Sequence, residues 1–251
     1  MKKKHLIVSV IIATSVLISS MAFAVEFGPN SAKITNRYNP ATVGDWSYMQ
    51  GAGTNWAGRF IYANVVGIEE VSGAQIDLDT FNNVKCLKVN LTMAKQEQDG
   101  EEEEDDFITI WMAQDTEGNL WILKIYIFPD NDTFLLGVLF KGLIFKSMFM
   151  PAVPAIGDSA GITIPEDTYN FCKVVEVDIP ISTNYGSYTS CIKTTCFHNS
   201  LTDPGDAEVE YYCPDVGEVR ASTVENPTDV IDLKNSGTAT VTRAVVIPLM
   251  D

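Results

Sequence analysis

The chain has 251 residues and a formal net charge of −16 at pH 7, with 20% charged and 46% hydrophobic residues. This length suits one large domain or two smaller ones with an ample core. The acidic excess argues against a nucleic-acid partner, because phosphate contacts need a basic surface. It also disfavours docking on anionic lipid by charge alone.

The first 24 residues predict a secretory signal peptide. Three lysines at positions 2–4 precede an apolar stretch at 6–18, and residues 22–24 read A-F-A, a small-x-small cleavage site. The apolar stretch is shorter than the roughly 20 residues of a bilayer-spanning helix, so no transmembrane segment is expected. Cleavage after Ala24 would leave Val25 first, without the cysteine of a lipobox. We therefore expect a secreted or periplasmic product of 227 residues, whose net charge becomes −19 without the three lysines.

The clearest strand signals flank one acidic turn. Residues 107–113, F-I-T-I-W-M-A, and 120–128, L-W-I-L-K-I-Y-I-F, are rich in β-branched and aromatic side chains. The polar stretch between them contains Gly118, which can take a positive φ. The pattern predicts a β-hairpin in which Trp111 and Trp121 pair across the strands.

Strand signals continue along the chain, and no long stretch shows helical spacing of apolar residues. A Pro204-Gly205 turn separates two of the predicted strands. Many short strands at this spacing indicate an all-β fold, a sandwich or a half-barrel. Further strands are expected at 133–140, 143–150, 171–181, 187–197, 208–212 and 238–249.

Three signatures recur in the same order in the two halves of the chain. P-A-T-V-G-D (40–45), V-K-C-L-K-V (84–89) and W-M-A-Q-D-T-E-G (111–118) return as P-A-I-G-D (154–158), T-S-C-I-K-T (189–194) and Y-Y-C-P-D-V-G (211–217). Their similar spacing indicates an internal repeat. The expected organisation is a signal peptide at 1–24, a first β repeat at 25–135 and a second at 136–251, each a curved antiparallel sheet.

Four stretches together resemble a family of exported bacterial proteins and lipoproteins that has no assigned activity. They are N-P-A-T-V-G-D-W-S-Y, W-M-A-Q-D-T-E-G-N-L-W, M-P-A-V-P-A-I-G-D-S and E-Y-Y-C-P-D-V-G-E-V-R, spread over residues 39–221. The family carries, in this order, P-x-x-x-G-x-x-W/Y, A-Q-D-x-x-G-N-x-W, M-P-x-x-P-x-x-G-D and Y-Y-A-P-G-V-G-x-V. This chain departs from it at Cys213 and Asp215, where the family has Ala and Gly. The resemblance implies export and a β-rich fold.

Five cysteines and no C-x-x-C spacing predict structural disulfides in an exported chain. If the hairpin before residue 208 centres near 202–203, Cys191 and Cys213 face each other. Cys172 with Cys196 is then the remaining pairing, which leaves Cys86 free and buried. This is one of several connectivities that the sequence allows, and each such loop would stabilise the fold by about 3 kcal/mol.

The acidic run at 97–106, E-Q-D-G-E-E-E-E-D-D, is expected to be a solvated loop, because like charges repel. Weak calcium binding is the alternative, through Glu101, Glu102, Asp105 and Asp106, and contact with a basic partner is a third possibility. The run lacks the D-x-D-x-D-G alternation that aims carboxylates at one ion. No other cofactor is expected.

The apolar stretch 134–156 favours either core packing or an apolar ligand site, because consecutive apolar residues in a strand point to both faces. Flexible Met148 and Met150 suit an irregular apolar ligand such as a lipid. The first functional hypothesis is thus a non-catalytic exported binding protein for an apolar or amphipathic ligand. The alternative is a structural or surface-assembly protein that self-associates through exposed strands. Candidate ligand contacts are Trp46, Trp56, Phe145, Met148, Phe149 and Met150.

An enzyme is the less favoured hypothesis. Asp115 and Asp215, at matching positions in the two halves, could act as paired carboxylates of a hydrolase. An aspartate in a hairpin turn more often accepts hydrogen bonds from turn amides. His198 is the one histidine beyond the leader, and no G-x-S-x-G, P-loop or dinucleotide glycine pattern is present.

Overall fold

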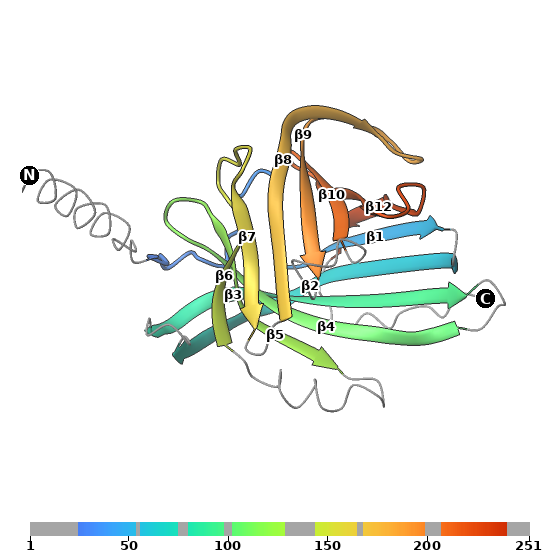
Figure 1. Ribbon diagram of the computed structural model, residues 1–251. Helices are drawn as coiled ribbons and strands as arrows, with labels where there is room; N and C mark the ends of the chain where they lie inside the picture. The colour runs from blue at the N-terminus through green and yellow to red at the C-terminus, as the bar shows by residue number, and fades with distance from the viewer. Residues whose placement is uncertain are drawn as a thin grey trace, which may run out of the picture.

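The protein is an all-β molecule, as the sequence predicts (Figure 1). A computed structural model describes residues 25–53, 56–74, 80–97, 102–128, 144–164, 168–198 and 207–239. Within these ranges no helix is long and apolar enough to cross a membrane. The strands are β1 (Asp45–Ala52), β2 (Trp56–Ala74), β3 (Thr80–Glu97), β4 (Glu102–Gln114), β5 (Leu120–Phe128), β6 (Ile144–Met150), β7 (Ser159–Ile164), β8 (Thr168–Ser182), β9 (Ser187–His198), β10 (Ala207–Cys213), β11 (Gly217–Thr223) and β12 (Val230–Thr238).

All twelve strands form one antiparallel sheet made of two meanders. The first meander runs from β1 to β6 and the second from β7 to β12, and the ladder between β1 and β12 joins them. The two halves therefore continue into one another as a single sheet. The sheet ends at β6 and β7, which contact each other. In Figure 1 the strands of the first half and those of the second half cross at a steep angle, as a strongly curved and twisted sheet requires.

Several predicted strands coincide with observed ones. Residues 120–128 are β5, 187–197 lie within β9, and 143–150 and 171–181 correspond to β6 and β8. The predicted strand 133–140 lies outside the described residues, as does all but the first two residues of 238–249. β6 pairs with β5, so the first meander extends to Met150, beyond the expected repeat boundary at 135.

Two local expectations were wrong. Residues 102–106 of the acidic run are strand rather than loop, because β4 continues the long ladder with β3, where Glu103 stands opposite Lys95. Trp111 and Trp121 do not pair directly, because the register of the hairpin places Trp121 opposite Ala113. Trp111 stands opposite Lys124 instead, and its ring lies between Lys124 and Lys88, at 4.2 Å and 5.3 Å from the two ammonium nitrogens.

The two halves match in detail beyond the sequence signatures. A β-bulge follows Trp111 in the first half and Tyr211 in the second. The glycines that precede β1 and β7 both have a positive φ of nearly the same value. The equivalent ion pairs are Lys88–Glu69 at 2.8 Å and Lys193–Glu176 at 2.9 Å.

Two disulfides connect neighbouring strands of the second half. Cys172 and Cys196 stand directly opposite each other on β8 and β9, and Cys191 of β9 is bonded to Cys213 of β10. The Cys191–Cys213 bond is the one expected from the hairpin register, and Cys172–Cys196 is the pairing that then remained. Cys86 is a free, buried thiol, and burial raises its pKa to about 12.

Candidate functional site

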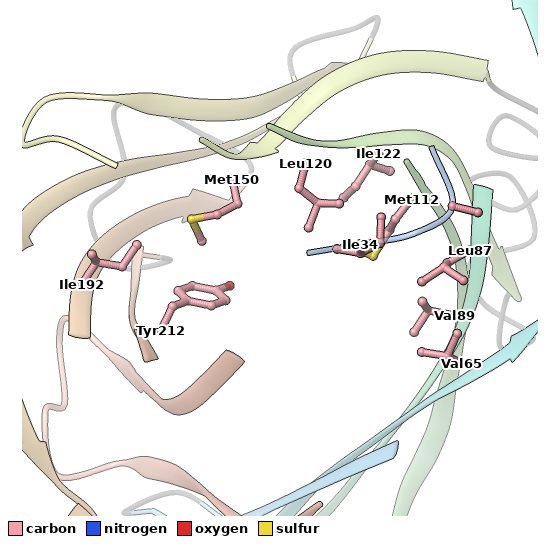
Figure 2. Close-up of a cluster of buried hydrophobic side chains, with 11 residues drawn as sticks. Ile34, Val65, Leu87, Val89, Met112, Leu120, Ile122, Met150, Ile192 and Tyr212 are labelled. Carbon is pink, nitrogen blue, oxygen red and sulfur yellow. The ribbon is translucent and has the colours of Figure 1, made fainter. Parts of the chain in front are cut away.

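The largest buried cluster lies on one face of the sheet, which we call the inner face. It unites side chains from both halves, and Figure 2 shows them facing one another across the inside of the curved sheet. Residues of the N-terminal segment, Ala32 and Ile34, also belong to it. The other members are Val65, Leu87, Val89, Met112, Leu120, Ile122, Met150, Ile192 and Tyr212.

Among the described residues, part of the apolar surface on the inner face remains uncovered. Apolar side chains around the buried cluster remain partly exposed, among them Leu91, Ile110, Ile125, Phe149 and Val177. Part of the apolar surface on this face of the twelve-stranded sheet is therefore available for contact.

The first half contributes an apolar wall to this face, and the second half contributes a polar one at matching positions. Counted from the shared bulge, Ile108, Ile110 and Met112 of β4 correspond to Glu208, Glu210 and Tyr212 of β10. The corresponding cross-strand pairs are Met112–Ile122 in the first half and Tyr212–Glu218 in the second. We call Glu208, Glu210, Tyr212 and Glu218 the acidic wall.

Short contacts tie the acidic wall together. The Tyr212 hydroxyl donates to Glu210 Oε2 over 2.8 Å, and Thr194 Oγ1 lies 3.5 Å from the same oxygen. Arg59 Nη1, which comes from β2 of the first half, lies 3.5 Å from Glu208 Oε1. Arg59 thus brings a guanidinium of the first half against a carboxylate of the second.

Burial and neighbouring negative charges make Glu218 and Tyr212 hard to ionise. Burial raises the pKa of Glu218 well above its ordinary value, and the negative charges of Glu210 and Glu208 raise it further, against a smaller lowering by Arg59. The pKa of Tyr212 is likewise raised by burial and then by the neighbouring carboxylates. Because part of the Glu218 surface is still accessible, this side chain lines the interior rather than filling it. The carboxyl of Glu218 therefore holds its proton more tightly than an exposed glutamate does.

The structure does not bring the six ligand contacts predicted from the sequence together at one site. Met150 is 2% exposed in the inner cluster, and Phe149 packs beside it with its ring edge-on to Tyr212, 6.1 Å between centroids. Met148 packs instead against a second cluster, which contains Trp111 and Trp121. The remaining three residues are Trp46, which lies on β1, and Trp56 and Phe145, whose side chains lie outside the described residues.

The two aspartates of the hydrolase hypothesis do not come together. Asp115 lines one open pocket of about 320 Å³ with Gln114, and Asp215 lines another of about 330 Å³ with Arg37. The Asp115 carboxylate accepts four hydrogen bonds of 2.8–2.9 Å from the backbone amides of Glu117 and Asn119, the Asn119 side chain and the Trp121 indole. These contacts are those of a turn-forming aspartate.

The calcium hypothesis stays a prediction. Glu101 lies outside the described residues, and the side chains of Glu102, Asp105 and Asp106 are not described although their backbone belongs to β4.

Sequence reasoning missed the acidic wall. Its only local signal is the alternation of Glu208 and Glu210 before two tyrosines, which places both carboxylates on one face of a strand. A residue-by-residue alignment of the two halves would have aligned these glutamates with Ile108 and Ile110. It would thus have shown that ionisable side chains replace apolar ones in the second half.

Comparison with known proteins gives little further guidance. No protein-family model and no curated protein matches the chain. Among solved structures, a crystal structure of a candidate lipoprotein from Parabacteroides distasonis shares 12% sequence identity over 80% of this chain and 99% of its own, with a TM-score of 0.38.

Proposed function

We propose that the protein is an exported, non-catalytic binding protein whose inner face holds an amphipathic ligand. The apolar part of the ligand would lie on the wall formed by Ile108, Ile110 and Ile122, and its polar part would meet the acidic wall. The observation that carries this proposal is the exchange of apolar for ionisable side chains at matching positions of the two halves.

Energetics support a ligand rather than a purely structural role. Buried carboxylates lower the stability of a fold unless they are paired. Well-packed apolar side chains at the same positions would make the fold more stable. Glu218 is buried beside two further carboxylates, those of Glu208 and Glu210, whose charges raise its pKa, and a polar ligand group would give this placement a function. Partly exposed Phe149 and Ile110 beside them supply the apolar contact that a ligand tail needs.

The two disulfides support a location outside the cytoplasm. Bonds such as Cys172–Cys196 and Cys191–Cys213 persist in oxidising surroundings outside the cytoplasm. We also propose that the two halves arose by duplication, after which the second copy acquired its glutamates. The matched bulges and ion pairs support this history.

Native mass spectrometry of the full chain, purified from the exported fraction without reductant, tests the proposal. Extra mass that is lost on activation, together with two disulfides in the bare chain, is the expected result. An apo monomer that also fails to bind the fluorescent amphiphile N-phenyl-1-naphthylamine would overturn ligand binding. A ladder of oligomers without added mass would favour the assembly alternative.

Two neighbouring residues of β6 provide a matched pair of variants. Phe149 packs on the inner cluster and Met148 on the cluster of the other face. Phe149→Ala should weaken binding of the naphthylamine probe about tenfold, because an aromatic contact is worth about 1 kcal/mol or more. Met148→Ala removes a similar apolar volume but should leave the affinity within about twofold. Equal effects of the two changes would locate the probe elsewhere.

A further inference from the structure

The disulfide between Cys172 of β8 and Cys196 of β9 lies on the inner face, beside the acidic wall. Cys196 stands opposite Glu208 of that wall, and Cys172 stands opposite Cys196. Residues directly opposite each other share a face of a sheet. The Cys196 Sγ atom also lies 3.1 Å from Glu210 Oε2. Two sulfur atoms and a carboxylate are therefore neighbours on the inside of the sheet.

The first half of the sheet carries apolar side chains at the same positions. Counted from the lysines of the two equivalent ion pairs, Leu91 and Ala63 form the cross-strand pair at the place of this disulfide, and Ile110 occupies the place of Glu210. The shared backbone thus accepts apolar residues at all three positions. The second half replaces them with three residues whose side chains can bind a metal ion.

The two disulfides differ in how accessible their sulfur atoms are. Cys172 is partly exposed, although its partner Cys196 is buried. Cys191 and Cys213 are only 0% and 1% exposed. A thiol reductant must reach one sulfur atom, because it cleaves a disulfide by attack of its thiolate. A reductant should therefore open the Cys172–Cys196 bond while the Cys191–Cys213 bond stays closed.

Opening this bond would leave the two strands paired. Phe171 pairs with Phe197 on one side of the disulfide, and Lys173 pairs with Thr195 on the other. These neighbours belong to the backbone ladder between β8 and β9, which does not depend on the sulfur atoms. The ladder therefore keeps the two reduced thiols opposite each other on one face.

Glu210 is held in position by neighbouring hydroxyl groups. The Tyr212 hydroxyl donates to Glu210 Oε2 over 2.8 Å, and Thr194 Oγ1 lies 3.5 Å from the same oxygen. Hydrogen bonds of this kind orient carboxylates that bind metal ions. The oxygen nearest to Cys196 is thus the one that its neighbours orient.

From this geometry we propose that the reduced thiols of Cys172 and Cys196 bind a zinc ion together with the carboxylate of Glu210. The three ligand atoms lie within 4.8 Å of one another, and within the described part of the chain this is the one such group. Zinc binds thiolate at about 2.3 Å and carboxylate at about 2.0–2.2 Å, so its ligand atoms lie about 4 Å apart or less. Two thiolates favour zinc over calcium or magnesium, which prefer oxygen ligands. Three protein ligands leave the fourth position of a tetrahedral ion to water.

The change from disulfide to metal site is a two-electron reduction by a dithiol. One thiolate of the reductant attacks the Cys172 sulfur, the S–S bond breaks, and Cys196 leaves as a thiolate. The second thiol of the reductant then displaces Cys172, and the reductant departs as its own disulfide. Both cysteines bind zinc as thiolates, so the two protons of the dithiol pass to the solvent. The redox state of this cysteine pair therefore decides whether the metal site exists.

Reduction of the native full chain with dithiothreitol, followed by gel filtration under nitrogen, tests the accessibility of the bond. Alkylation with iodoacetamide and mass spectrometry should then identify two modified cysteines, Cys172 and Cys196. Modification of Cys191 and Cys213 under the same native conditions, or of no cysteine, would overturn the proposal.

Isothermal titration calorimetry with zinc chloride tests the metal site itself. The reduced chain should bind one zinc ion. The oxidised chain should bind zinc at least about a hundredfold more weakly, since loss of even an outer partner of a metal ligand costs about 10- to 100-fold in affinity. Absence of binding to the reduced chain would overturn the proposal. Equal binding to both forms would do so too, because it would place the ion on carboxylates elsewhere.

Variants test the three ligands. Glu210→Gln, which can be purified with both disulfides closed, should weaken zinc binding to the reduced chain at least about tenfold. Glu176→Gln is the matched control, because Glu176 lies on β8 but pairs with Lys193, and it should leave zinc affinity unchanged. Replacement of both Cys172 and Cys196 by serine should abolish the difference between reduced and oxidised samples. Unchanged affinity of Glu210→Gln would refute the proposed ligand set.

The metal site and the amphipathic site can fail separately. Zinc binding is measured on the reduced chain, whereas binding of the naphthylamine probe is measured on the oxidised chain, in which the metal site is closed. A chain that binds the probe but no zinc would refute the metal site alone, and the reverse result would refute the amphipathic site alone.

Discussion

Tyr212 stands opposite Glu218 across the ladder between β10 and β11, at the position where the first half of the sheet pairs Met112 with Ile122. The same bulge precedes both pairs, so the backbone presents the two sets of side chains alike. The exchange of an apolar pair for an ionisable one therefore changes the chemistry of the inner face without changing its geometry. This relation is the basis of the proposed amphipathic site.

Glu218→Gln should make the protein more stable at neutral pH. Burial holds the pKa of Glu218 above the unfolded value of about 4.3. The folded state thus keeps a proton that the unfolded state loses, and stability falls as pH rises from the unfolded pKa through the folded one. Thermal melts of the wild type and Glu218→Gln at pH 4 to 9 should show a smaller decline in Tm for the variant.

Among the described residues, the groups that act on Glu218 or face it are Glu208, Glu210, Tyr212 and Arg59. Because the variant retains all of them, the difference between the two pH profiles isolates Glu218. Parallel profiles would contradict the assignment of a raised pKa.

Asp115→Ala should destabilise the fold far more than Asp215→Ala. The Asp115 carboxylate is 8% exposed and satisfies the indole N–H of Trp121 and the turn amide of Asn119. Its loss leaves buried donors unpaired, which costs about 1–3 kcal/mol. Asp215 is exposed, and its own amide bonds to the carbonyl of Arg37 through the backbone. Urea unfolding should give a change of about 0.5 kcal/mol or less for Asp215→Ala.

Asp232→Ala should be among the most damaging single substitutions. Asp232 is fully buried and accepts from Arg220 Nε at 2.6 Å, Arg220 Nη2 at 3.0 Å and the amide of Asn184 at 3.0 Å. Removal of one partner leaves Arg220 unpaired, at a cost of about 3–5 kcal/mol. The matched control is Glu176→Gln, which breaks the more exposed Lys193 pair and should cost less than about 1 kcal/mol. Similar urea midpoints for both variants would refute this ranking.

Four cysteines should form two disulfides, and Cys86 should be a buried thiol that does not react in the native protein. Native protein should not react with a thiol reagent at pH 8, because Cys86 is buried and its pKa is about 12, whereas unfolded protein should react at one site per chain. Replacement of Cys191 and Cys213 together by serine should lower the free energy of unfolding by about 3 kcal/mol, since the bond spans 22 residues. Three reactive thiols in the unfolded wild type would contradict the pairing.

Local patterns in the sequence were enough for the fold class and for much of the second half. Alternating and β-branched segments predicted β5, β6, β8, β9 and β10, because strand propensity and turn residues are properties of neighbouring residues. The hairpin register around Pro204 also placed Cys191 opposite Cys213, since a register counts residues from the turn. The turn role of Asp115 likewise followed from its position before Gly118.

Other features depended on the tertiary structure. The register that places Trp121 opposite Ala113 and the extension of β4 into the acidic run arise from pairing with β5 and β3, which the residue pattern of a single strand does not specify. The two halves form a single sheet because β1 pairs with β12. These two strands lie near opposite ends of the described chain. Which face Met148, Phe149 and Trp46 occupy was also undetermined, because a shift of one residue in register reverses the face of every side chain.

The sequence by itself determined the all-β class, several strands of the sheet, the pairing of Cys191 with Cys213 and the acidic character of this protein. Only the tertiary structure decided that Glu208, Glu210 and Glu218 face an apolar wall and that Trp46 lies on Gly237 of β12. The physical reason is range: propensity and turn chemistry act within a few residues, whereas burial, charge repulsion and ring packing depend on strands that the fold brings together from distant parts of the chain.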